Sequence, residues 1–293
     1  MKKFRIISLI AVAVVLTLGM IGFARAATTV NLGTASTYAV LAGSTVTNTG
    51  SSVITGNLGL SPGTSVTGFP PGTLSGTQNV ANAAAVQAKT DLTTAYTNAA
   101  GQTPTTTVPT ELGGTTKTAG IYNSADGTFG ITGTLTLDAQ NNADAVFIFK
   151  TASTLTTAGA STVVLVNGAQ ACHVFWQVGS SATLGANSTF KGSILALTSI
   201  TLTTGANVQG SALARNGAVT LDTNVITTAT CAAATTTTNT NTTTTNTNTS
   251  GTALPSTGLP PDTNKTPWAL IVITGIFALV STSLVLVKKT RKM

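Results

Sequence analysis

A short pattern recurs through the middle of this chain, in which a small residue stands two positions before a Thr-Leu pair. Five segments align on that pair, and their central threonines are 20, 29, 18 and 19 residues apart. The segments are residues 132–136, 152–156, 181–185, 199–203 and 218–222. A period near 19 residues, made of short β-branched runs and Gly/Asn turns, is typical of a β-solenoid with one coil per repeat.

The alternation of side chains along a strand predicts how the repeats pack. Successive strand residues point to opposite faces, so each leucine is expected inside and the flanking Thr, Ser or Ala outside. A second repeat supports this stacking, because the Gly-Ala-Asn of residues 185–187 returns at 205–207. The interval of 29 residues contains two further apolar runs, 163–166 and 172–176, and predicts an added strand or a larger turn.

One segment departs from the repeats and predicts a long helix over about residues 77–100. Ser75 and Gln78 have the spacing of a capping box, which marks a helix start. Small apolar residues then recur every three or four positions, as on one face of a helix. They are Ala81, Ala85, Ala88, Leu92, Ala95 and Ala99. Gly101 ends the pattern, and residues 102–120 are expected to form a loop that returns the chain to the stack.

The repeats carry almost no charge, although the whole chain has a net charge of +7. That surplus lies at the two ends, before Ala27 and after Gly258. Between the ends, Lys89, Lys117, Lys150, Lys191 and Arg215 are balanced by Asp91, Glu111, Asp126, Asp138, Asp144 and Asp222. Nucleic acid requires clustered cations, so it is not an expected partner.

Few residues of this region could carry catalysis. An active site needs titratable groups together in a cleft, whereas this region has a single histidine, His173, and scattered carboxylates. Asp138 and Asp144 are the nearest pair, but they flank Asn141 and Asn142 and are expected to serve turn hydrogen bonds. We therefore expect no enzymatic activity, no metal and no cofactor.

The N-terminus predicts a secretory signal peptide over residues 1–26. A basic start is followed by an apolar run to Phe23 and by Ala-Arg-Ala at 24–26, a small-x-small cleavage site. The alternative is a retained N-terminal anchor. In an exported protein an even number of cysteines, here Cys172 and Cys231, predicts a disulfide, the alternative being two buried free thiols.

Three features follow one another at the C-terminus. The first is the motif Leu254-Pro255-Ser256-Thr257-Gly258. An apolar stretch at 267–287 is long enough to span a bilayer, and the basic tail at 288–293 is typical of a cytoplasmic end. Residues 232–253, almost entirely Thr, Asn and Ala, have too little apolar content for a core and predict a linker.

This arrangement resembles the LPXTG sorting signal of sortase substrates. The resemblance implies cleavage between Thr257 and Gly258 by sortase and transfer of Thr257 to peptidoglycan, after a transient stay in the membrane. The expected location is the cell wall, on the extracellular surface of a Gram-positive-type bacterium. The alternative is an ordinary single-pass membrane protein.

A second resemblance covers about residues 29–229. It is carried by the segments 32–35, 38–50, 56–63, 145–149, 174–185 and 214–222, which include Tyr-Ala-Val-Leu-Ala-Gly and Val-Phe-Trp-Gln-Val-Gly. They resemble the ice-binding protein family of microbial antifreeze β-solenoids. The resemblance implies a mostly β fold over residues 27–231, a discontinuous triangular β-solenoid with one long α-helix packed alongside. Its first and last coils would be adjacent, and the C-terminal transmembrane helix would be separate.

The same resemblance implies binding to the surface of an ice crystal through a flat face of small residues. Thr combines a hydroxyl with a methyl, and its β-branching restricts χ1, so a rigid row loses little side-chain entropy on binding. The candidate residues are Thr134, Thr136, Thr154, Thr156, Thr183, Asn187, Ser199, Thr201, Thr203, Thr204, Asn207 and Thr220. The alternative is a surface adhesin of the same fold that binds polysaccharide or another cell.

Overall fold

The computed structural model of the protein describes residues 27–232. The predicted signal peptide, the linker after Ala232, the sorting motif, the apolar stretch and the basic tail lie outside the described residues, so these segment boundaries stay predictions. Within residues 27–232, the one long helix is not apolar enough to cross a bilayer.

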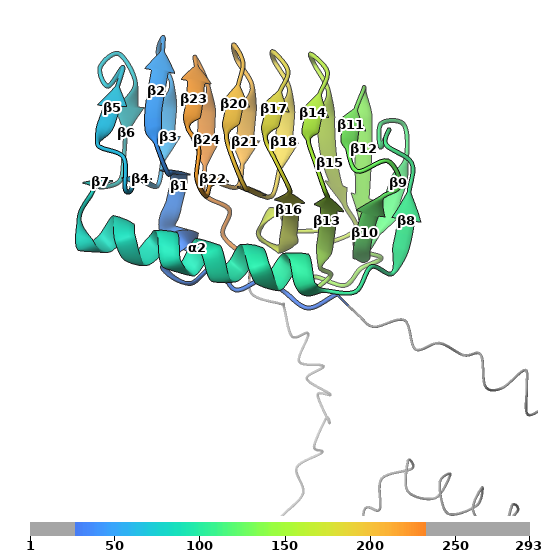
Figure 1. Ribbon diagram of the computed structural model, residues 1–293. Helices are drawn as coiled ribbons and strands as arrows, with labels where there is room; N and C mark the ends of the chain where they lie inside the picture. Colours follow the sequence, from blue (N-terminus) through green and yellow to red (C-terminus); the bar gives the residue numbers. More distant parts are fainter. Residues whose placement is uncertain (1–26, 233–293) are drawn as a thin grey trace, which may run out of the picture. The chain divides into compact units, whose positions relative to one another are not determined.

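Three parallel sheets form the three sides of a stack of coils (Figure 1). Sheet A contains, in spatial order, β7 (Gln78–Val80), β4 (Asn57–Leu60), β1 (Tyr38–Ala42), β22 (Ala212–Ala214), β19 (Ser193–Ala196), β16 (Val174–Val178), β13 (Phe147–Thr151), β10 (Gly120–Ser124) and β8 (Thr106–Val108). Sheet B contains β11 (Phe129–Ile131), β14 (Leu155–Thr157), β17 (Ala182–Leu184), β20 (Ile200–Leu202), β23 (Val219–Asp222), β2 (Thr45–Thr49) and β5 (Ser65–Thr67). Sheet C contains β6 (Thr73–Leu74), β3 (Val53–Thr55), β24 (Val225–Thr227), β21 (Asn207–Gln209), β18 (Thr189–Lys191), β15 (Thr162–Val166), β12 (Thr134–Asp138) and β9 (Thr116–Thr118).

The order of coils in space differs from their order in the chain. The N-terminal strands β1, β2 and β3 pair with the C-terminal strands β22, β23 and β24. The chain then builds β4 to β7, crosses the length of the stack through the helix, and returns from β8 to β24 (Figure 1). The predicted adjacency of first and last coils is therefore confirmed, as are a mostly β fold and one long α-helix.

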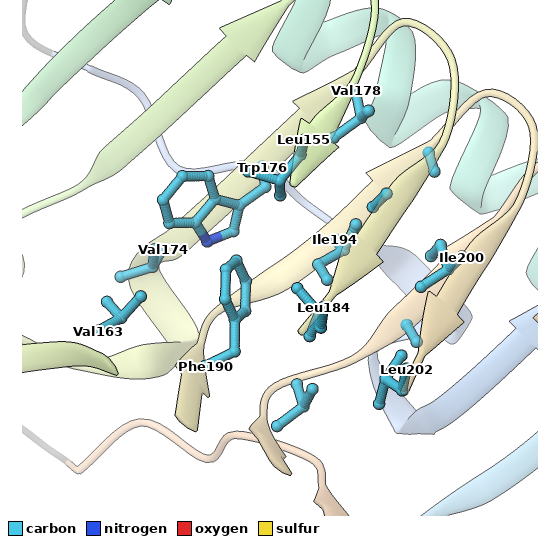
Figure 2. Packing of buried hydrophobic residues seen from close by; sticks show 14 of the residues in the cluster. Leu155, Val163, Val174, Trp176, Val178, Leu184, Phe190, Ile194, Ile200 and Leu202 are labelled. Carbon is cyan, nitrogen blue, oxygen red and sulfur yellow. The ribbon is translucent and has the colours of Figure 1, made fainter. Parts of the chain in front are cut away.

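The interior of the stack is filled by apolar side chains from the inward positions of all three sheets (Figure 2). At one end of the stack these are aromatic and lie in register on neighbouring strands. Ring centroids are 5.2 Å apart for Tyr122 and Phe149 and 4.2 Å apart for Phe149 and Trp176. The indole Nε1 of Trp176 donates to the carbonyl of Lys191 at 3.0 Å. Close packing of this kind makes the stack rigid.

The helix α2 (Ala83–Gly101) covers the outer face of sheet A. Its buried stripe is Ala85, Ala88, Leu92, Ala95 and Ala99, as predicted. On the sheet side it meets the large outward residues Leu41, Phe175 and Leu213. Small helix residues against large sheet residues let the helix lie close to the sheet.

Contacts made by three charged side chains, those of Lys89, Lys150 and Asp91, also fasten the helix to the rest of the domain. The ammonium of Lys89 donates to the carbonyls of Ala214 and Arg215. Lys150 Nζ donates to the carbonyl of Gln102, just past the helix, at 2.6 Å.

The third of these side chains joins the helix to the N-terminal segment, which includes the 3₁₀ turn η1 (Gly33–Thr37). Asp91 Oδ2 accepts from the Thr34 backbone N–H at 2.8 Å and from its hydroxyl at 2.7 Å. The segment before β1 is thereby held against the helix.

The predicted helix start was wrong. Residues 78–80 form β7, which pairs with β4, and Ala81 is exposed with a left-handed φ of 48°. The cap is Asn82, whose side chain accepts from the Ala85 N–H at 2.9 Å. A Ser-x-x-Gln spacing cannot by itself distinguish a helix cap from a short strand, and sheet pairing decided the outcome.

Two connecting segments, residues 102–120 and the interval of 29 residues before Thr183, contain more regular structure than expected. Residues 102–120 are not a plain loop, because they contain β8 and β9 of the terminal coil. The long interval before Thr183 holds a complete coil enlarged by the turn that contains η2 (Ala171–His173). This turn carries Cys172, and the predicted disulfide between Cys172 and Cys231 is confirmed.

Candidate functional site

One register position of sheet B carries threonine in six successive strands. Each residue is paired with the next across the ladder, so the side chains form one line over the outer face of the sheet. In spatial order they are Thr156, Thr183, Thr201, Thr220, Thr47 and Thr67, and we call them the threonine row. Neighbouring strands are about 4.8 Å apart, which sets the spacing of the row.

Strand alternation places the row on the outside. In β17 and β20 the residues on either side of the central threonine are fully or almost fully buried, whereas Thr183 is exposed and Thr201 half-exposed. The turns between sheets A and B keep the coils close together. A Cβ at Gly217 would lie only 2.7 Å from the backbone carbonyl group of Thr198, so only glycine allows this approach.

The hydroxyls of the row have no hydrogen-bond partner among residues 27–232. By contrast, the Thr203 hydroxyl donates to the Leu184 carbonyl at 2.7 Å, and the Thr204 hydroxyl donates to Asp222. The Ser199 hydroxyl accepts from the Ala218 N–H at 3.2 Å. The row therefore presents free hydroxyl groups to whatever lies above it.

No charged residue lies within the row itself, although Asp222 is the next outward residue of β23 after Thr220. The row's terminal neighbour on one side is Gly130 of β11, and beyond that Glu111 forms an isolated bridge with Gly130. The Glu111 carboxylate accepts from Gly113 N at 2.6 Å, from Thr132 N at 2.8 Å and from the Thr132 hydroxyl at 3.0 Å. Desolvation raises the pKa of Glu111, but these hydrogen bonds outweigh it and hold that pKa below its usual value. An ionised carboxylate thus marks this end of the row.

The other two sheets lack such a surface. Sheet A is covered by α2. On sheet C, the position that begins with Thr134 continues in space through Thr162, Thr189, Asn207, Val225, Val53 and Thr73. The next outward position of sheet C includes Lys191, whose ammonium donates to the Gln209 side chain at 2.8 Å. Sheet C therefore mixes hydroxyl, amide, apolar and charged groups.

The residues predicted for the flat face fall into three places. Thr156, Thr183, Thr201 and Thr220 lie together in the row. Thr134 and Thr136 of β12 and Asn207 of β21 lie on sheet C instead. The rest lie at the ends of sheet B strands or in the turns beside them: Thr154, Asn187, Ser199, Thr203 and Thr204.

The Thr-Leu alignment behind those predictions was partly wrong. Its first segment belongs to sheet C, and its second is two residues out of register, because Thr156 rather than Thr154 pairs with Thr183. The alternation of apolar and small polar residues is common to sheets B and C, so it cannot identify the sheet. Thr47 and Thr67 were missed because the inward residue next to each of them is valine, whereas the alignment required leucine. The sequence pattern that could have identified them is Thr-Val-Thr at 45–47 and Ser-Val-Thr at 65–67.

Of the two carboxylates predicted to serve turn hydrogen bonds, Asp138 does so, whereas Asp144 takes part in its turn through its backbone N–H. Asp138 Oδ1 accepts from the Gln140 N–H and from the Asn167 side chain, both at 2.8 Å. The Asp144 N–H donates to the Asn142 side chain at 3.0 Å. His173 lies beside Cys172 and Cys231, but both sulfurs are used in the disulfide.

A protein-family model described as Ice-binding-like matches residues 40–227. The chain belongs to the ice-binding-like family. It is 50% identical over 208 residues to an ice-binding protein of Nostoc sp. (strain HG1), covering 70% of this chain and 77% of that relative. It is 33% identical over 217 residues to an ice-binding protein of Flavobacterium frigoris (strain PS1), covering 68% and 76%.

Solved structures of this family share the fold. An ice binding protein from an Antarctic Biological Consortium has a TM-score of 0.68 and 48% identity, covering 70% of this chain and 93% of that structure. An ice-binding protein of the Antarctic ascomycete Antarctomyces psychrotrophicus has a TM-score of 0.67 and 41% identity, covering 69% and 98%. The ice-binding-like domain thus accounts for nearly all the described residues.

Proposed function

We propose that this protein is not an enzyme and binds ice through the threonine row on sheet B. The observation that carries the proposal is the row itself: six threonines in register, one per strand, with hydroxyls free of internal partners. The relatives and solved structures named above, which are called ice-binding proteins, support it over nearly the whole domain.

The physical basis is a match between two periodic surfaces. The three-sided stack acts as a rigid β-solenoid, so the row is a fixed grid with a step of about 4.8 Å. Each threonine offers a hydroxyl for hydrogen bonding and a methyl that orders the adjacent water. Because χ1 of threonine is restricted, little entropy is lost on contact. Many weak contacts from one rigid body then give slow release from the crystal.

An adhesin that binds polysaccharide finds less support. Sugar rings are commonly held by exposed aromatic side chains, and within residues 27–232 no aromatic side chain is exposed. The aromatic residues of this part of the chain instead fill the interior of the stack, lie under α2 as Tyr38 and Phe175 do, or are half-buried, as Phe69 and Tyr96 are.

The proposal includes display on the cell wall. Export through the signal peptide, sortase cleavage after Thr257 and linkage to peptidoglycan would place the domain outside the cell, where it could hold the cell against ice or limit recrystallisation. The order of motif, apolar stretch and basic tail supports this location. In fractionated cells, a Thr257→Ala variant should move from the wall fraction to the membrane fraction; equal wall content would contradict anchoring.

Ice binding is tested by a pair of matched substitutions. Thr201→Tyr places a large ring in the middle of the row, whereas Thr189→Tyr makes the same change on sheet C. In thermal-hysteresis and recrystallisation assays of the purified protein, Thr201→Tyr should lose most activity and Thr189→Tyr should keep it. Equal activity of both variants and wild type would reject the row as the site, and inactivity of all three would reject ice binding.

A further inference from the structure

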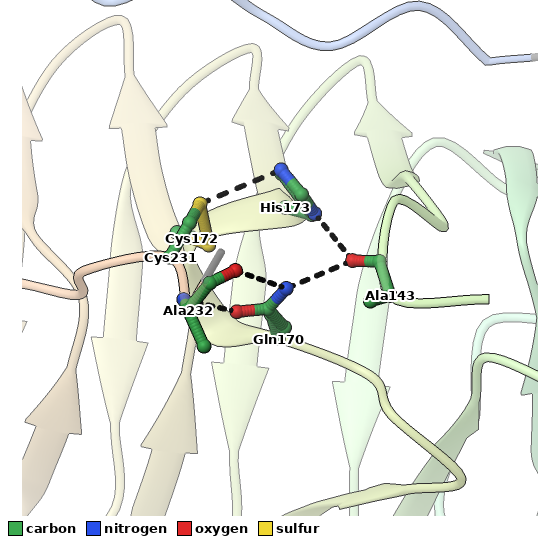
Figure 3. Close-up of a disulfide and its surroundings, with 6 residues drawn as sticks. All are labelled: Ala143, Gln170, Cys172, His173, Cys231 and Ala232. Carbon is green, nitrogen blue, oxygen red and sulfur yellow. Dashed lines mark hydrogen bonds between the residues drawn. A yellow bond between two sulfur atoms is a disulfide. The ribbon is translucent and has the colours of Figure 1, made fainter. Parts of the chain in front are cut away.

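The C-terminal end of the domain is held by its last strand, β24, and also by contacts with the middle of the stack. Beyond β24, Cys231 is bonded through its sulfur to Cys172, in the turn that leads into β16 (Figure 3). Gln170 of the same turn holds the next residue by both backbone groups. Its Oε1 accepts from Ala232 N at 2.6 Å, and its Nε2 donates to the Ala232 carbonyl at 3.3 Å.

This attachment reaches one coil further. Gln170 Nε2 also donates to the Ala143 carbonyl at 2.9 Å, and Nδ1 of His173 lies 3.1 Å from the same oxygen (Figure 3). The other ring nitrogen of His173 lies 3.4 Å from Cys231 Sγ. Ala143 belongs to the turn between β12 and β13. The cluster therefore ties the exit of the chain to the turns of two successive coils.

Without the disulfide, the exit would be held by the two Gln170–Ala232 hydrogen bonds and by the short strand β24. The strand β24 has three residues and is joined to β21 and β3 by backbone hydrogen bonds. After it, Thr228 N donates to the Thr55 carbonyl at 3.1 Å. A pull on the chain beyond Ala232 would load these few bonds first and draw β24 out of sheet C.

We propose that the Cys172–Cys231 bridge has a mechanical function: it is the point at which tension from the anchored C-terminus enters the domain. This inference rests on the proposed anchoring, because only an anchored chain is pulled from that end. Load that enters at Cys172 bypasses β24 and passes into the strands on either side of that turn, β15 before it and β16 after it. The coil of β16 contributes Thr183 to the threonine row. That coil also contributes Trp176 to the aromatic interior. An ice-bound cell could then be held without the last strands unravelling.

The test is single-molecule pulling of the chain by handles at its two ends, comparing wild type with a Cys172→Ser/Cys231→Ser variant. The variant should show an early low-force event that releases β24, and the oxidised wild type should lack it. Unfolding of the wild type should also release less chain. The bridge encloses a sequence separation of 59 residues, which at ~3.6 Å each is a deficit of about 210 Å. Gln170→Ala, which keeps the bridge, is the matched control and should also lack the early event.

A second pulling geometry separates a load path from general stabilisation. With one handle at the N-terminus and the other inserted at the exposed turn 140–142, the bridge is not between the points of pulling. Wild type and the double serine variant should then give the same first event.

The proposal would be overturned if, with handles at the two ends, the double serine variant lacked the early event as the wild type does. It would also be overturned if the variant and the wild type differed as much in the second geometry as in the first. Neither measurement involves ice or the wall. The double variant is expected to keep its thermal hysteresis, so failure of ice binding would be recognised separately.

Discussion

Glu111 and Gly130 occupy the two positions that would continue the threonine row beyond Thr156. If the row is the ice-contacting surface, threonine at both positions should extend it. Gly130 does not have a left-handed φ, so a β-branched residue can adopt its conformation. A Cβ there would lie 3.3 Å from Glu111 Oε2, and the second substitution removes that contact. The double variant Glu111→Thr/Gly130→Thr is therefore compatible with the backbone.

The expected gain follows from the geometry of the row. Six threonines at a step of about 4.8 Å span about 24 Å, and eight would span about 34 Å. The change also removes an ionised carboxylate, whose own hydration shell disturbs ordered water at that end. We expect thermal hysteresis to rise measurably at equal protein concentration. Some stability should be lost, because the Glu111 carboxylate no longer accepts from Gly113 and Thr132.

Thermal hysteresis should be measured at a temperature where circular dichroism shows the variant folded. Gly130→Ala adds a methyl group but no hydroxyl at this position of the row, and it should leave thermal hysteresis near that of the wild type. Glu111→Gln removes the charge but keeps an acceptor oxygen for the two N–H groups, so it isolates the effect of charge. Unchanged or lower hysteresis in the folded double variant would refute the idea that contact with ice extends along this row.

Three further predictions concern the scaffold. Reduction of the disulfide, or Cys172→Ser/Cys231→Ser, should lower the free energy of unfolding by about 4 kcal/mol in urea titrations, since the closed loop spans a sequence separation of 59 residues; a loss below 1 kcal/mol would count against this. Asn82→Ala should cost about 1 kcal/mol by removing the cap of α2, whereas the neighbouring exposed Ala83→Ser should change stability little. Burial, aided by the charge of Arg215, lowers the pKa of Lys89 to about 8 from 10.5. The unfolded chain therefore binds more protons between these values, so stability should rise with pH from about 8 to 10.5. Lys89→Met should flatten that rise in thermal melts, and an identical pH profile would contradict the assignment.

The alternation of large apolar and small residues was enough to predict the sheets. Leu155, Leu184 and Leu202 are buried as expected, because a strand residue between two outward neighbours must face the core. The alanine stripe predicted the helix for the same reason, since its period fits one face of a helix. Segment ends were less predictable, because the limits of β7 and α2 depend on pairing with β4, a contact distant in the chain.

The site was predictable only in part. A coil has three sides, and two of them demand the same alternation, so local pattern could not separate the threonines of sheet B from those of sheet C. Register also depends on turn length, which differs between coils. The turn before β16 is long enough to carry η2, and it made the interval before Thr183 appear irregular. Only the ladder pairings show that Thr156 and Thr183 are neighbours.

The row owes its length to the docking of the N-terminal coils. Thr47 and Thr67 are far from Thr220 in the chain, and they join the row only because β2 pairs with β23. A buried side chain supports this docking. Asn224 donates through Nδ2 to the carbonyls of Thr203 and Ala206, both at 2.8 Å, while its backbone N–H donates to the Ser52 hydroxyl at 2.9 Å. A buried polar group held by three partners tolerates one arrangement of the coils. The same contact that closes the fold therefore aligns two separate parts of the sequence into one continuous surface.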